Sequence, residues 1–312
     1  RRCEAYNFAM KIRIATRLSP LAMLQTNEVI EKIKFFDPHC ICEIIKMESE
    51  GDLTDTPLHM IGGKGLFVSK LEMALESGIA DIAVHSLKDV PASINSKFSI
   101  AATLPREAAV DAILLKEGLT IDDLSKNLKI ATSGPRRRSQ LLSINPKLNI
   151  VPIRGNIQTR INKIQADDLD GLIVAKAALN RLKILHPNIH VFSEKQMLPA
   201  AAQGAIGVEV NTQEVSSHIS DLLHLINDQL TYEATQIERL VVASLEGNCL
   251  SPISALCKID GQDAELKVRV SNQDGTDVYN EVTRFKLKNK IDAVNNFIEI
   301  LIRKGAKEII QR

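Results

Sequence analysis

The sequence has no long apolar run, no excess of either charge and few aromatic residues. A membrane-spanning helix needs roughly 20 consecutive apolar residues, and none of the 312 residues begins such a stretch. Lys and Arg (39) nearly balance Asp and Glu (38), which leaves a formal net charge of +1, and only 4% of the residues are aromatic. We therefore expect no membrane partner and no nucleic-acid partner, since the latter needs a broad basic face and stacking aromatic rings.

Cysteine is scarce and irregularly spaced. The five cysteines are Cys3, Cys40, Cys42, Cys249 and Cys257. No Cys-x-x-Cys pair occurs and no histidine lies at metal-ligand spacing, so we expect neither a disulfide framework nor a metal site. Free cysteine is among the most buried residue types, and composition alone therefore favours inert, buried thiols, including Cys249 in its loop.

The first residues carry no export signal. They lack an apolar core followed by a small-residue cleavage site, so a cytoplasmic location is expected. The first strand pattern begins just after Met10. We interpret residues 1–9 as an upstream extension or an expression remnant and leave them out of the predicted fold.

The order of predicted elements indicates an α/β fold with a different C-terminal part. With 45% hydrophobic and 25% charged residues, the chain is long enough for two or three globular domains. Short apolar strands alternate with helices in the first two thirds, which indicates parallel sheets. These strands are predicted at 11–16, 40–45, 81–85, 98–103, 128–132, 150–153 and 171–175, and the longer helices at 21–34, 66–75 and 176–185. After residue 210 we expect a helix at 228–245, antiparallel strands at 253–259, 265–270 and 279–287, and helices at 292–304 and 306–311.

Charged residues recur where predicted strands end and helices begin. They are Arg17, Asp89, Arg136, Arg137, Arg154, Arg160 and Arg181. The carboxyl ends of parallel strands meet at one edge of a sheet, where helix N-termini also attract anions. Because a guanidinium can bind a carboxylate through two hydrogen bonds, the pattern predicts a small ligand with several carboxylates. The alternative is a surface or structural role for any single arginine, and a capping role for the aspartate.

Several motifs occur in a fixed order along the chain. They are Arg13-Ile-Ala-Thr-Arg17 with Ser19-Pro-Leu-Ala22, Gly62-Gly-Lys-Gly-Leu-Phe67, Asp81-Ile-Ala-Val-His-Ser-Leu-Lys-Asp-Val-Pro91, Arg154-Gly-Asn156, Gln203-Gly204, and Leu245-Glu-Gly247 before Cys249. In these motifs the chain resembles the porphobilinogen deaminase (hydroxymethylbilane synthase) family. The resemblance implies a transferase of porphyrin, tetrapyrrole and haem biosynthesis.

The resemblance also implies an architecture. It consists of two periplasmic-binding-protein-like domains with mixed, mainly parallel sheets, and a small C-terminal α+β domain with a three-stranded antiparallel sheet. Domain 1 comprises residues 10–104 plus 205–222 and holds the catalytic aspartate and a lid loop. Domain 2 comprises 105–204 and is rich in arginine, and domain 3 comprises 223–312 and holds the cofactor-attachment cysteine. Family precedent implies a monomer.

A covalent cofactor is the main chemical implication. Family members hold a dipyrromethane through a thioether to one cysteine, and Cys249 is the matching position. This overrides the interpretation of Cys249 as an inert thiol. On this primer four porphobilinogen molecules lose ammonia and are joined head to tail, and water then releases hydroxymethylbilane. Asp89 is the implied catalytic residue, which stabilises positive charge in the transition states.

The remaining site residues are implied by correspondence of the motifs. The implied cofactor-binding residues are Ser86, Lys88, Asp89, Thr132, Ser133, Arg136 and Arg137. The implied substrate-binding residues are Arg17, Ser19, Gln25, Lys64, Phe67, Arg154, Gly155, Asn156, Arg160, Arg181 and Gln203. No metal is implied.

Three departures from the family pattern leave questions for the structure. Asn248 stands where the family usually has a glycine before the cysteine, Gly134-Pro135 replaces Ser-Leu before the arginine pair, and the segment 106–111 lacks some of the usual charges. A different class of function also fits the arginines, namely a non-catalytic, two-domain anion-binding receptor or sensor. Cys249 distinguishes the two, because a receptor needs no modified thiol.

Overall fold

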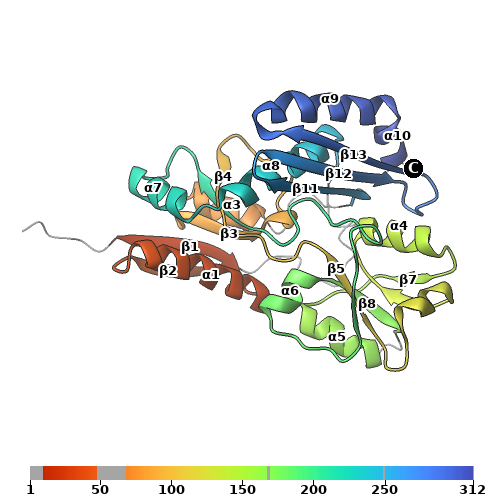
Figure 1. Cartoon of the computed structure of the whole chain (residues 1–312). Helices are drawn as coiled ribbons and strands as arrows, with labels where there is room; N and C mark the ends of the chain where they lie inside the picture. The colour runs from red at the N-terminus through yellow and green to blue at the C-terminus, as the bar shows by residue number, and fades with distance from the viewer. Residues whose placement is uncertain (1–9, 48–67, 167–168, 249, 312) are drawn as a thin grey trace, which may run out of the picture.

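The computed structural model describes residues 10–47, 68–166, 169–248 and 250–311. This part of the chain forms three β-sheets with helices packed around them (Figure 1). We call each sheet with its helices a unit, numbered 1 to 3. In Figure 1 unit 1 lies at the left, unit 2 at the lower right and unit 3 above unit 2.

Unit 1 is built on a five-stranded sheet of order β2-β1-β3-β10-β4. Its strands are β1 (Lys11–Arg17), β2 (Ile41–Met47), β3 (Ile82–Ser86), β4 (Phe98–Thr103) and β10 (Ile206–Asn211), and its helices are α1 (Pro20–Phe36), α3 (Ser69–Glu76), the 3₁₀ helix η1 (Leu87–Asp89) and α7 (Ser217–Ile226). β1 pairs in parallel with β2 and β3, whereas β10 pairs antiparallel with β3 and β4. The predicted start of α1 is confirmed, because the Ser19 hydroxyl accepts from the Ala22 amide at 3.2 Å and Pro20 occupies the first turn.

Unit 2 repeats this strand order with a different part of the chain. Its five-stranded sheet has the order β7-β6-β8-β5-β9. The strands are β5 (Asp111–Leu115), β6 (Lys129–Ala131), β7 (Asn149–Val151), β8 (Gly171–Ala175) and β9 (Ile189–Val191), and the helices are η2 (Ile121–Ser125), α4 (Pro135–Ile144), α5 (Ile157–Ala166) and α6 (Lys176–Arg181). β6 pairs in parallel with β7 and β8, whereas β5 pairs antiparallel with β8 and β9. The two sheets thus share one topology, which confirms the predicted pair of similar, mixed α/β units.

Two segments connect units 1 and 2, and they run side by side. The chain leaves unit 1 after β4 and returns to it after β9, so each antiparallel strand, β5 or β10, follows a crossing. The Glu107 amide donates to the Gly204 carbonyl oxygen at 3.2 Å and joins the two crossings. Gly204 has φ 89°, and a Cβ atom there would collide with the Glu107 carbonyl oxygen. Glycine is therefore required at this position.

Unit 3 is an antiparallel sheet of order β11-β12-β13 with helices packed on it. Its elements are α8 (Gln229–Ser244), β11 (Ile253–Asp260), β12 (Asp263–Ser271), β13 (Val278–Lys286), the 3₁₀ helix η3 (Leu287–Asn289), α9 (Lys290–Arg303) and α10 (Ala306–Ile310). Apolar side chains that alternate along β12, such as Leu266, Val268 and Val270, are buried against α8 and α9. The predicted three-stranded antiparallel sheet is confirmed.

The ion pair between Arg106 and Glu238 connects unit 3 to both crossings. Arg106 of the first crossing donates to both oxygens of Glu238 on α8, at 2.6 and 3.1 Å, and to the Gln203 carbonyl oxygen of the second, at 2.8 Å. Glu238 also accepts from the backbone amides of Ala202 (2.6 Å) and Cys257 (2.8 Å) and is fully buried. The altered segment 106–111 therefore keeps an ion pair at the hinge.

The structure differs from the sequence prediction in four elements. The strands β5, β9 and β10 and the helix α7 were not predicted. Strand β10 alternates apolar Ile206, Val208 and Val210 with Gly207, Glu209 and Asn211, yet all six positions are buried. The expected helix 66–75 is observed as α3 from residue 69, and its first two residues lie outside the described part.

Two of the three described cysteines are buried, as predicted from composition, whereas Cys42 is half-buried. Cys40 and Cys257 are buried, and burial raises the pKa of each thiol to about 12. Cys42 lies on the same face as Cys40, with the two sulfur atoms 3.9 Å apart. Cys3 and Cys249 lie outside the described residues.

Unit 3 also docks on unit 2 through the turn between β12 and β13. Ser143 of α4 donates to the Gly275 carbonyl oxygen at 2.7 Å, and Ser271 donates to the Ser139 hydroxyl at 2.9 Å. Gly275 has φ 72°, and a Cβ atom there would collide with the Ser139 carbonyl oxygen. The turn therefore approaches α4 as closely as only a glycine permits.

We predict that Gly275→Ala destabilises the protein by about 3 kcal/mol, from the left-handed backbone and the collision together. Gly261→Ala is the matched control, because Gly261 has φ 57° but nothing within 4 Å of the added methyl group. We expect about 1 kcal/mol for the control. Urea unfolding followed by circular dichroism measures both, and equal losses would show that the turn does not press on α4.

Candidate active site

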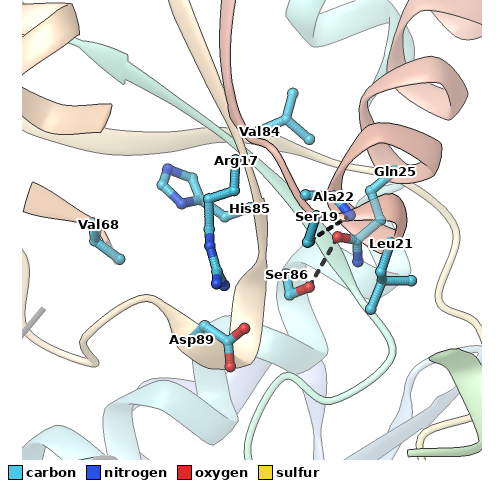
Figure 2. Close-up of a pocket in the computed structure, with 10 residues that line it drawn as sticks. All are labelled: Arg17, Ser19, Leu21, Ala22, Gln25, Val68, Val84, His85, Ser86 and Asp89. Carbon is cyan, nitrogen blue, oxygen red and sulfur yellow. Dashed lines mark hydrogen bonds between the residues drawn. The ribbon is translucent and has the colours of Figure 1, made fainter. Parts of the chain in front are cut away.

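The carboxyl ends of β1 and β3 form one side of a pocket in unit 1. Arg17, the last residue of β1, and Asp89 both point into it (Figure 2). The remaining lining residues are Ser19, Leu21, Ala22, Gln25, Val68, Val84, His85 and Ser86. The sequence prediction that strand ends bring these polar residues together is consistent with this geometry.

The segment that carries Asp89 is a single 3₁₀ turn, anchored by its first residue. Leu87 is fully buried, and its amide donates to the Ala205 carbonyl oxygen at 3.0 Å. Just before it, the Ser86 hydroxyl donates to Gln25 of α1 at 2.9 Å (Figure 2). With Leu87 inside, the short turn leaves Lys88 partly exposed and Asp89 exposed. Asp89 is thus presented to the pocket from a fixed backbone.

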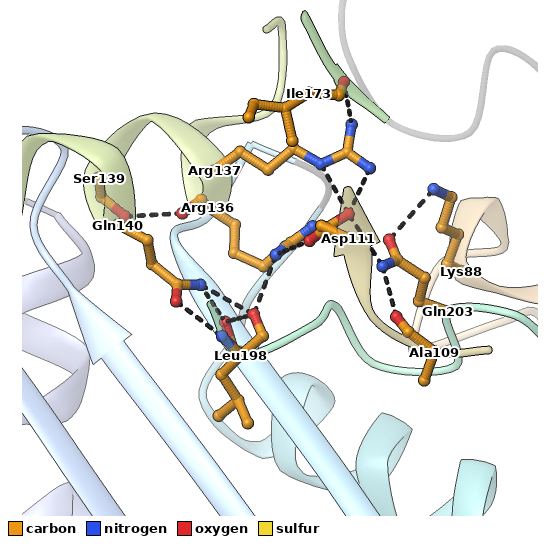
Figure 3. Close-up of polar contacts among 11 residues, drawn as sticks. Lys88, Ala109, Asp111, Arg136, Arg137, Ser139, Gln140, Ile173, Leu198 and Gln203 are labelled. Carbon is orange, nitrogen blue, oxygen red and sulfur yellow. Dashed lines mark hydrogen bonds and ion pairs between the residues drawn. The ribbon is translucent and has the colours of Figure 1, made fainter. Parts of the chain in front are cut away.

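A buried carboxylate organises the arginine pair of unit 2 (Figure 3). Asp111, at the start of β5, is fully buried. Arg136 donates to one of its oxygens at 2.7 Å, and Arg137 donates to the other through Nε at 3.1 Å and Nη2 at 2.7 Å. Arg136 also donates to the Leu198 carbonyl oxygen (2.9 Å). The side chains of Arg136 and Arg137 are only 9% and 12% exposed, so Asp111 fixes both guanidinium groups.

Asp111 was not among the residues expected at the site. Burial by itself would raise the pKa of its carboxyl group, but Arg136 and Arg137 outweigh burial and hold that pKa well below its ordinary value. The sequence feature that could have indicated Asp111 is a lone acidic residue directly before the apolar run Ala112 to Leu115. An aspartate at the start of a buried strand has to be paired.

Gln203 connects this cluster to Lys88 of unit 1. Its amide nitrogen donates to Asp111 at 3.0 Å and to the Ala109 carbonyl oxygen at 2.6 Å, and its amide oxygen accepts from Lys88 Nζ at 3.3 Å (Figure 3). Burial, and next the charge of Arg137, lower the pKa of Lys88 to about 8. One glutamine of the second crossing therefore joins Lys88 of unit 1 to the Asp111 carboxylate of unit 2.

The N-terminus of α5 positions Arg160. The Asn156 side chain accepts from the Thr159 amide at 2.9 Å, and the Gly155 carbonyl oxygen accepts from Arg160 Nε at 2.7 Å. Gly155 has φ 103°, a conformation that other residues rarely adopt. In this structure Gly155 and Asn156 therefore act on the helix terminus and on the orientation of Arg160.

Positive charge converges on Arg160 from both units. Burial lowers the pKa of Arg160, and the neighbouring charges of Arg137, Arg154 and Arg17 lower it further, while Asp89 opposes them. These residues follow strands of both sheets, yet they lie within each other's electrostatic field. The arrangement is an excess of guanidinium groups around one exposed carboxylate, which suits a ligand that carries several negative charges.

Two expected site residues make hydrogen bonds to other residues of the chain. The Ser133 hydroxyl contacts both the carbonyl oxygen and the amide of Ile153, so it joins the ends of β6 and β7. Arg181 of α6 donates to Glu28 of α1 at 3.0 Å and to the Gly204 carbonyl oxygen at 3.1 Å. Its side chain is only 6% exposed, and it bridges units 2 and 1.

Three expected residues lie outside the described part of the chain, namely Lys64, Phe67 and Cys249. The residues on either side of Cys249 are described. The Asn248 side chain accepts from the Leu250 amide at 2.8 Å, and the Asn248 amide donates to the Ser251 hydroxyl at 3.1 Å. Asn248 thus supplies a side-chain turn at the position where the family usually has glycine.

Among the described residues no helix is long and apolar enough to cross a membrane. No group of three or more His, Cys, Asp or Glu side chains in the described ranges is placed to hold a metal ion.

Comparison with known proteins identifies the family. Residues 12–218 match the family model "Porphobilinogen deaminase, dipyromethane cofactor binding domain". The chain belongs to the porphobilinogen deaminase family. Porphobilinogen deaminase of Maridesulfovibrio salexigens is 35% identical over 303 residues (97% of this chain, 98% of the relative), and that of Legionella pneumophila (strain Paris) is 38% identical over 301 residues (96% and 97%).

Solved structures align with this chain at low sequence identity. The BenM effector-binding domain with benzoate aligns with a TM-score of 0.42 at 17% identity, over 72% of this chain and 93% of that one. A TRAP periplasmic solute-binding protein from Desulfovibrio salexigens aligns with a TM-score of 0.41 at 13% identity, over 73% of this chain and 74% of that one.

The site of this deaminase-family chain fits a polycarboxylate cofactor. Lys88, Arg136 and Arg137 surround the single buried carboxylate of Asp111, which leaves an excess of positive charge. Thr132, directly after β6, is buried, and its hydroxyl has no hydrogen-bond partner within the described ranges. A buried polar atom without a partner is costly, so this hydroxyl is suited to a ligand.

We predict that Asp111→Asn lowers the pKa of Lys88 below about 8, because the charge of Asp111 favours the protonated amine. Arg137→Gln should raise it, because a repelling positive charge is removed. Both variants are made in a Cys249→Ala background without attached cofactor. The pKa is measured by NMR titration of ¹³C-dimethylated lysine, with Lys88→Arg to assign the resonance. Shifts of the opposite sign would show that Lys88 does not sense the Asp111 cluster.

Proposed function

We propose that this chain is a transferase that deaminates four porphobilinogen molecules, joins them head to tail on a dipyrromethane bound to Cys249 through a thioether, and releases hydroxymethylbilane. The match to a family model for the dipyrromethane cofactor-binding domain, over residues 12–218, carries this proposal. The convergence of arginines from two units around Asp89 supports it, since each pyrrole of the product bears an acetate and a propionate. A non-catalytic anion receptor is not favoured, because the family match concerns a cofactor-dependent enzyme.

In our proposal the cofactor is held at the Asp111 cluster. When bound, the dipyrromethane supplies the pyrrole carbon to which the first substrate is joined. Lys88, Arg136 and Arg137 bind its carboxylates, and Asp111 keeps the two guanidinium groups in place. The buried hydroxyl of Thr132 is available as a further contact. Ser86 and Ser133 are the other proposed cofactor-binding residues.

Asp89 is the proposed catalytic residue. Loss of ammonia from the aminomethyl group leaves a cationic pyrrole, and a fixed carboxylate stabilises that charge in the transition state. Asp89 suits this role because the 3₁₀ turn is anchored at Leu87 while the carboxylate itself is exposed to the pocket. Asp89 is also proposed to hold pyrrole N–H groups.

The substrate-binding residues expected from the sequence remain the proposal, and Lys64 and Phe67 among them lie outside the described part of the chain. The full set is Arg17, Ser19, Gln25, Lys64, Phe67, Arg154, Gly155, Asn156, Arg160, Arg181 and Gln203. Arg17 and Arg160 are proposed to bind the acetate and propionate groups of incoming porphobilinogen. Gly155 and Asn156 orient Arg160, and Gln203 orients Lys88, so these contribute through their neighbours. Arg181 is proposed to exchange Glu28 for a substrate carboxylate.

The domain bounds, the oligomeric state and the location are also part of the proposal. We propose domain 1 at 10–104 plus 205–222, domain 2 at 105–204 and domain 3 at 223–312, which agrees with the sheet to which each strand belongs. A cytoplasmic monomer remains the proposal made from the sequence.

We predict that the purified protein shows a mass increment of two pyrrole units and a colour reaction with Ehrlich's reagent, and that Cys249→Ala abolishes both. Cys42→Ala is the matched control, because Cys42 is a half-buried thiol of β2 in unit 1. Intact-protein mass spectrometry measures the increment. An increment that persists in Cys249→Ala would place the attachment at another residue.

We predict that Asp89→Asn folds and carries the cofactor but releases ammonia from porphobilinogen at least about 100-fold more slowly, the usual cost of losing one electrostatic contact to a transition state. Asp221→Asn removes an exposed carboxylate of α7 and should leave the rate unchanged. Ammonia release and uroporphyrinogen formation are followed together. No turnover by a folded, cofactor-loaded wild-type sample would refute the function, and near-normal rates in Asp89→Asn would refute the role of Asp89.

A further inference from the structure

Arg239 is not among the site residues described so far. It hydrogen-bonds to the backbone that directly follows Asp89. It lies on α8 of unit 3 and is only 6% exposed. Its Nη1 donates to the Val90 carbonyl oxygen at 3.0 Å, and its Nη2 donates to those of Pro91 at 2.8 Å and Ala92 at 3.5 Å. One planar guanidinium thus reaches three consecutive carbonyl groups.

These carbonyl groups belong to irregular backbone. The 3₁₀ helix ends at Asp89, and residues 90–92 lie in neither a helix nor a strand. Val90 is 4% exposed, and Pro91 has no amide hydrogen to donate. A buried carbonyl without a partner is costly, so Arg239 supplies donors that secondary structure does not provide here.

The turn that bears Asp89 is therefore held at both ends, by different units. On its N-terminal side, Ser86 donates to Gln25 and the Leu87 amide donates to Ala205. On its C-terminal side, the first partner is Arg239 of unit 3. Hydrogen bonds thus hold the backbone on both sides of Asp89. They leave the turn that carries the Asp89 carboxylate little freedom to move.

The charge of Arg239 is supported from unit 1. Burial lowers the pKa of Arg239, whereas Glu209 of β10 and Tyr232 of α8 raise it. Glu209 is fully buried and also contacts His85 Nε2 at 2.9 Å. His85 lies at the wall of the pocket, one residue before Ser86. Arg239 itself does not line the pocket, and it is separate from the arginines proposed to bind the ligand.

We propose that Arg239 is a positioning residue for Asp89. It acts through the carbonyl groups of residues 90–92, sets the position of the Asp89 carboxylate and does not contact the substrate. The inference rests on the proposed catalytic role of Asp89. Arg239 lies on α8, which ends at Ser244, shortly before Cys249 in the sequence. The same helix then fixes the catalytic carboxylate and leads into the cofactor attachment.

The kinetic test compares Arg239→Lys and Arg239→Gln with wild type. Arg239→Lys keeps the charge but loses the planar fork, and Arg239→Gln keeps one amide donor. For Arg239→Lys we expect kcat to fall about 10- to 100-fold, the cost of a misplaced catalytic group. KM should change less than about threefold, and the mass increment should remain. In an Asp89→Asn background the same change should lower kcat less than about twofold further, because residues that act as a unit are not additive.

The second test does not depend on turnover. Hydrogen exchange at the amides of residues 87–90 should accelerate in Arg239→Lys and Arg239→Gln, because the Val90 amide closes the turn by donating to the Leu87 carbonyl oxygen at 3.2 Å. Arg269→Lys is the control, a partly buried arginine on β12 of the same unit. Unchanged exchange, or multiplicative losses in the Asp89→Asn background, would overturn the proposal. Faster exchange in a protein without deaminase activity would leave Arg239 as an anchor and count against the proposed function alone.

Discussion

The site depends on one buried carboxylate that is outnumbered by cations. A fully buried aspartate is stable only when it is paired and hydrogen-bonded, and Asp111 receives four hydrogen bonds from Arg136, Arg137 and Gln203. The pairing in turn confines two long side chains that in water would sample many conformations. Since two arginines share one carboxylate and Lys88 lies beside them, the cluster keeps a net positive charge. A polycarboxylate ligand can neutralise this charge. The same interaction thus holds the fold at β5 and leaves the charge that the ligand needs.

The fold could be predicted from the sequence where local signals suffice. Strand β1 and helix α1 were located because an apolar strand is followed by Ser19 and Pro20, which cap and start the helix. The antiparallel strands β5 and β10 carry no comparable signal, because the crossing that precedes each of them decides which sheet it joins. The residues of β10 do alternate between apolar and polar or small types, but every position is buried, so the alternation does not mark a solvent-facing side of the sheet. Non-local pairing of this kind is not encoded in any short window of the sequence.

The candidate site, like the fold, could be predicted from the sequence only in part. The rule that strand ends gather at one edge placed Arg17, Asp89 and Arg160 correctly near one another. It could not separate residues that face a ligand from residues that orient them. Asn156 caps α5 and Ser133 joins two strand ends, roles that have the same residue preferences as ligand binding. Asp111 was missed because its partners lie 25 and 26 residues further along the chain.

The connections between units restrict where a growing product can be accommodated. Lys88 of unit 1 and the arginine pair of unit 2 are linked through Gln203, which lies on a crossing segment, and Arg106 joins that crossing to Glu238 of unit 3. A hinge motion that separated Lys88 from Arg137 would have to break the hydrogen bond of Gln203 to Lys88 or its hydrogen bond to Asp111. Arg17 and Arg160, on the other side of Asp89, follow strands of different sheets and lie within each other's electrostatic field. Because the link from Lys88 through Gln203 to Asp111 is costly to break, an elongating chain of pyrroles should leave the cluster around Asp111 in place.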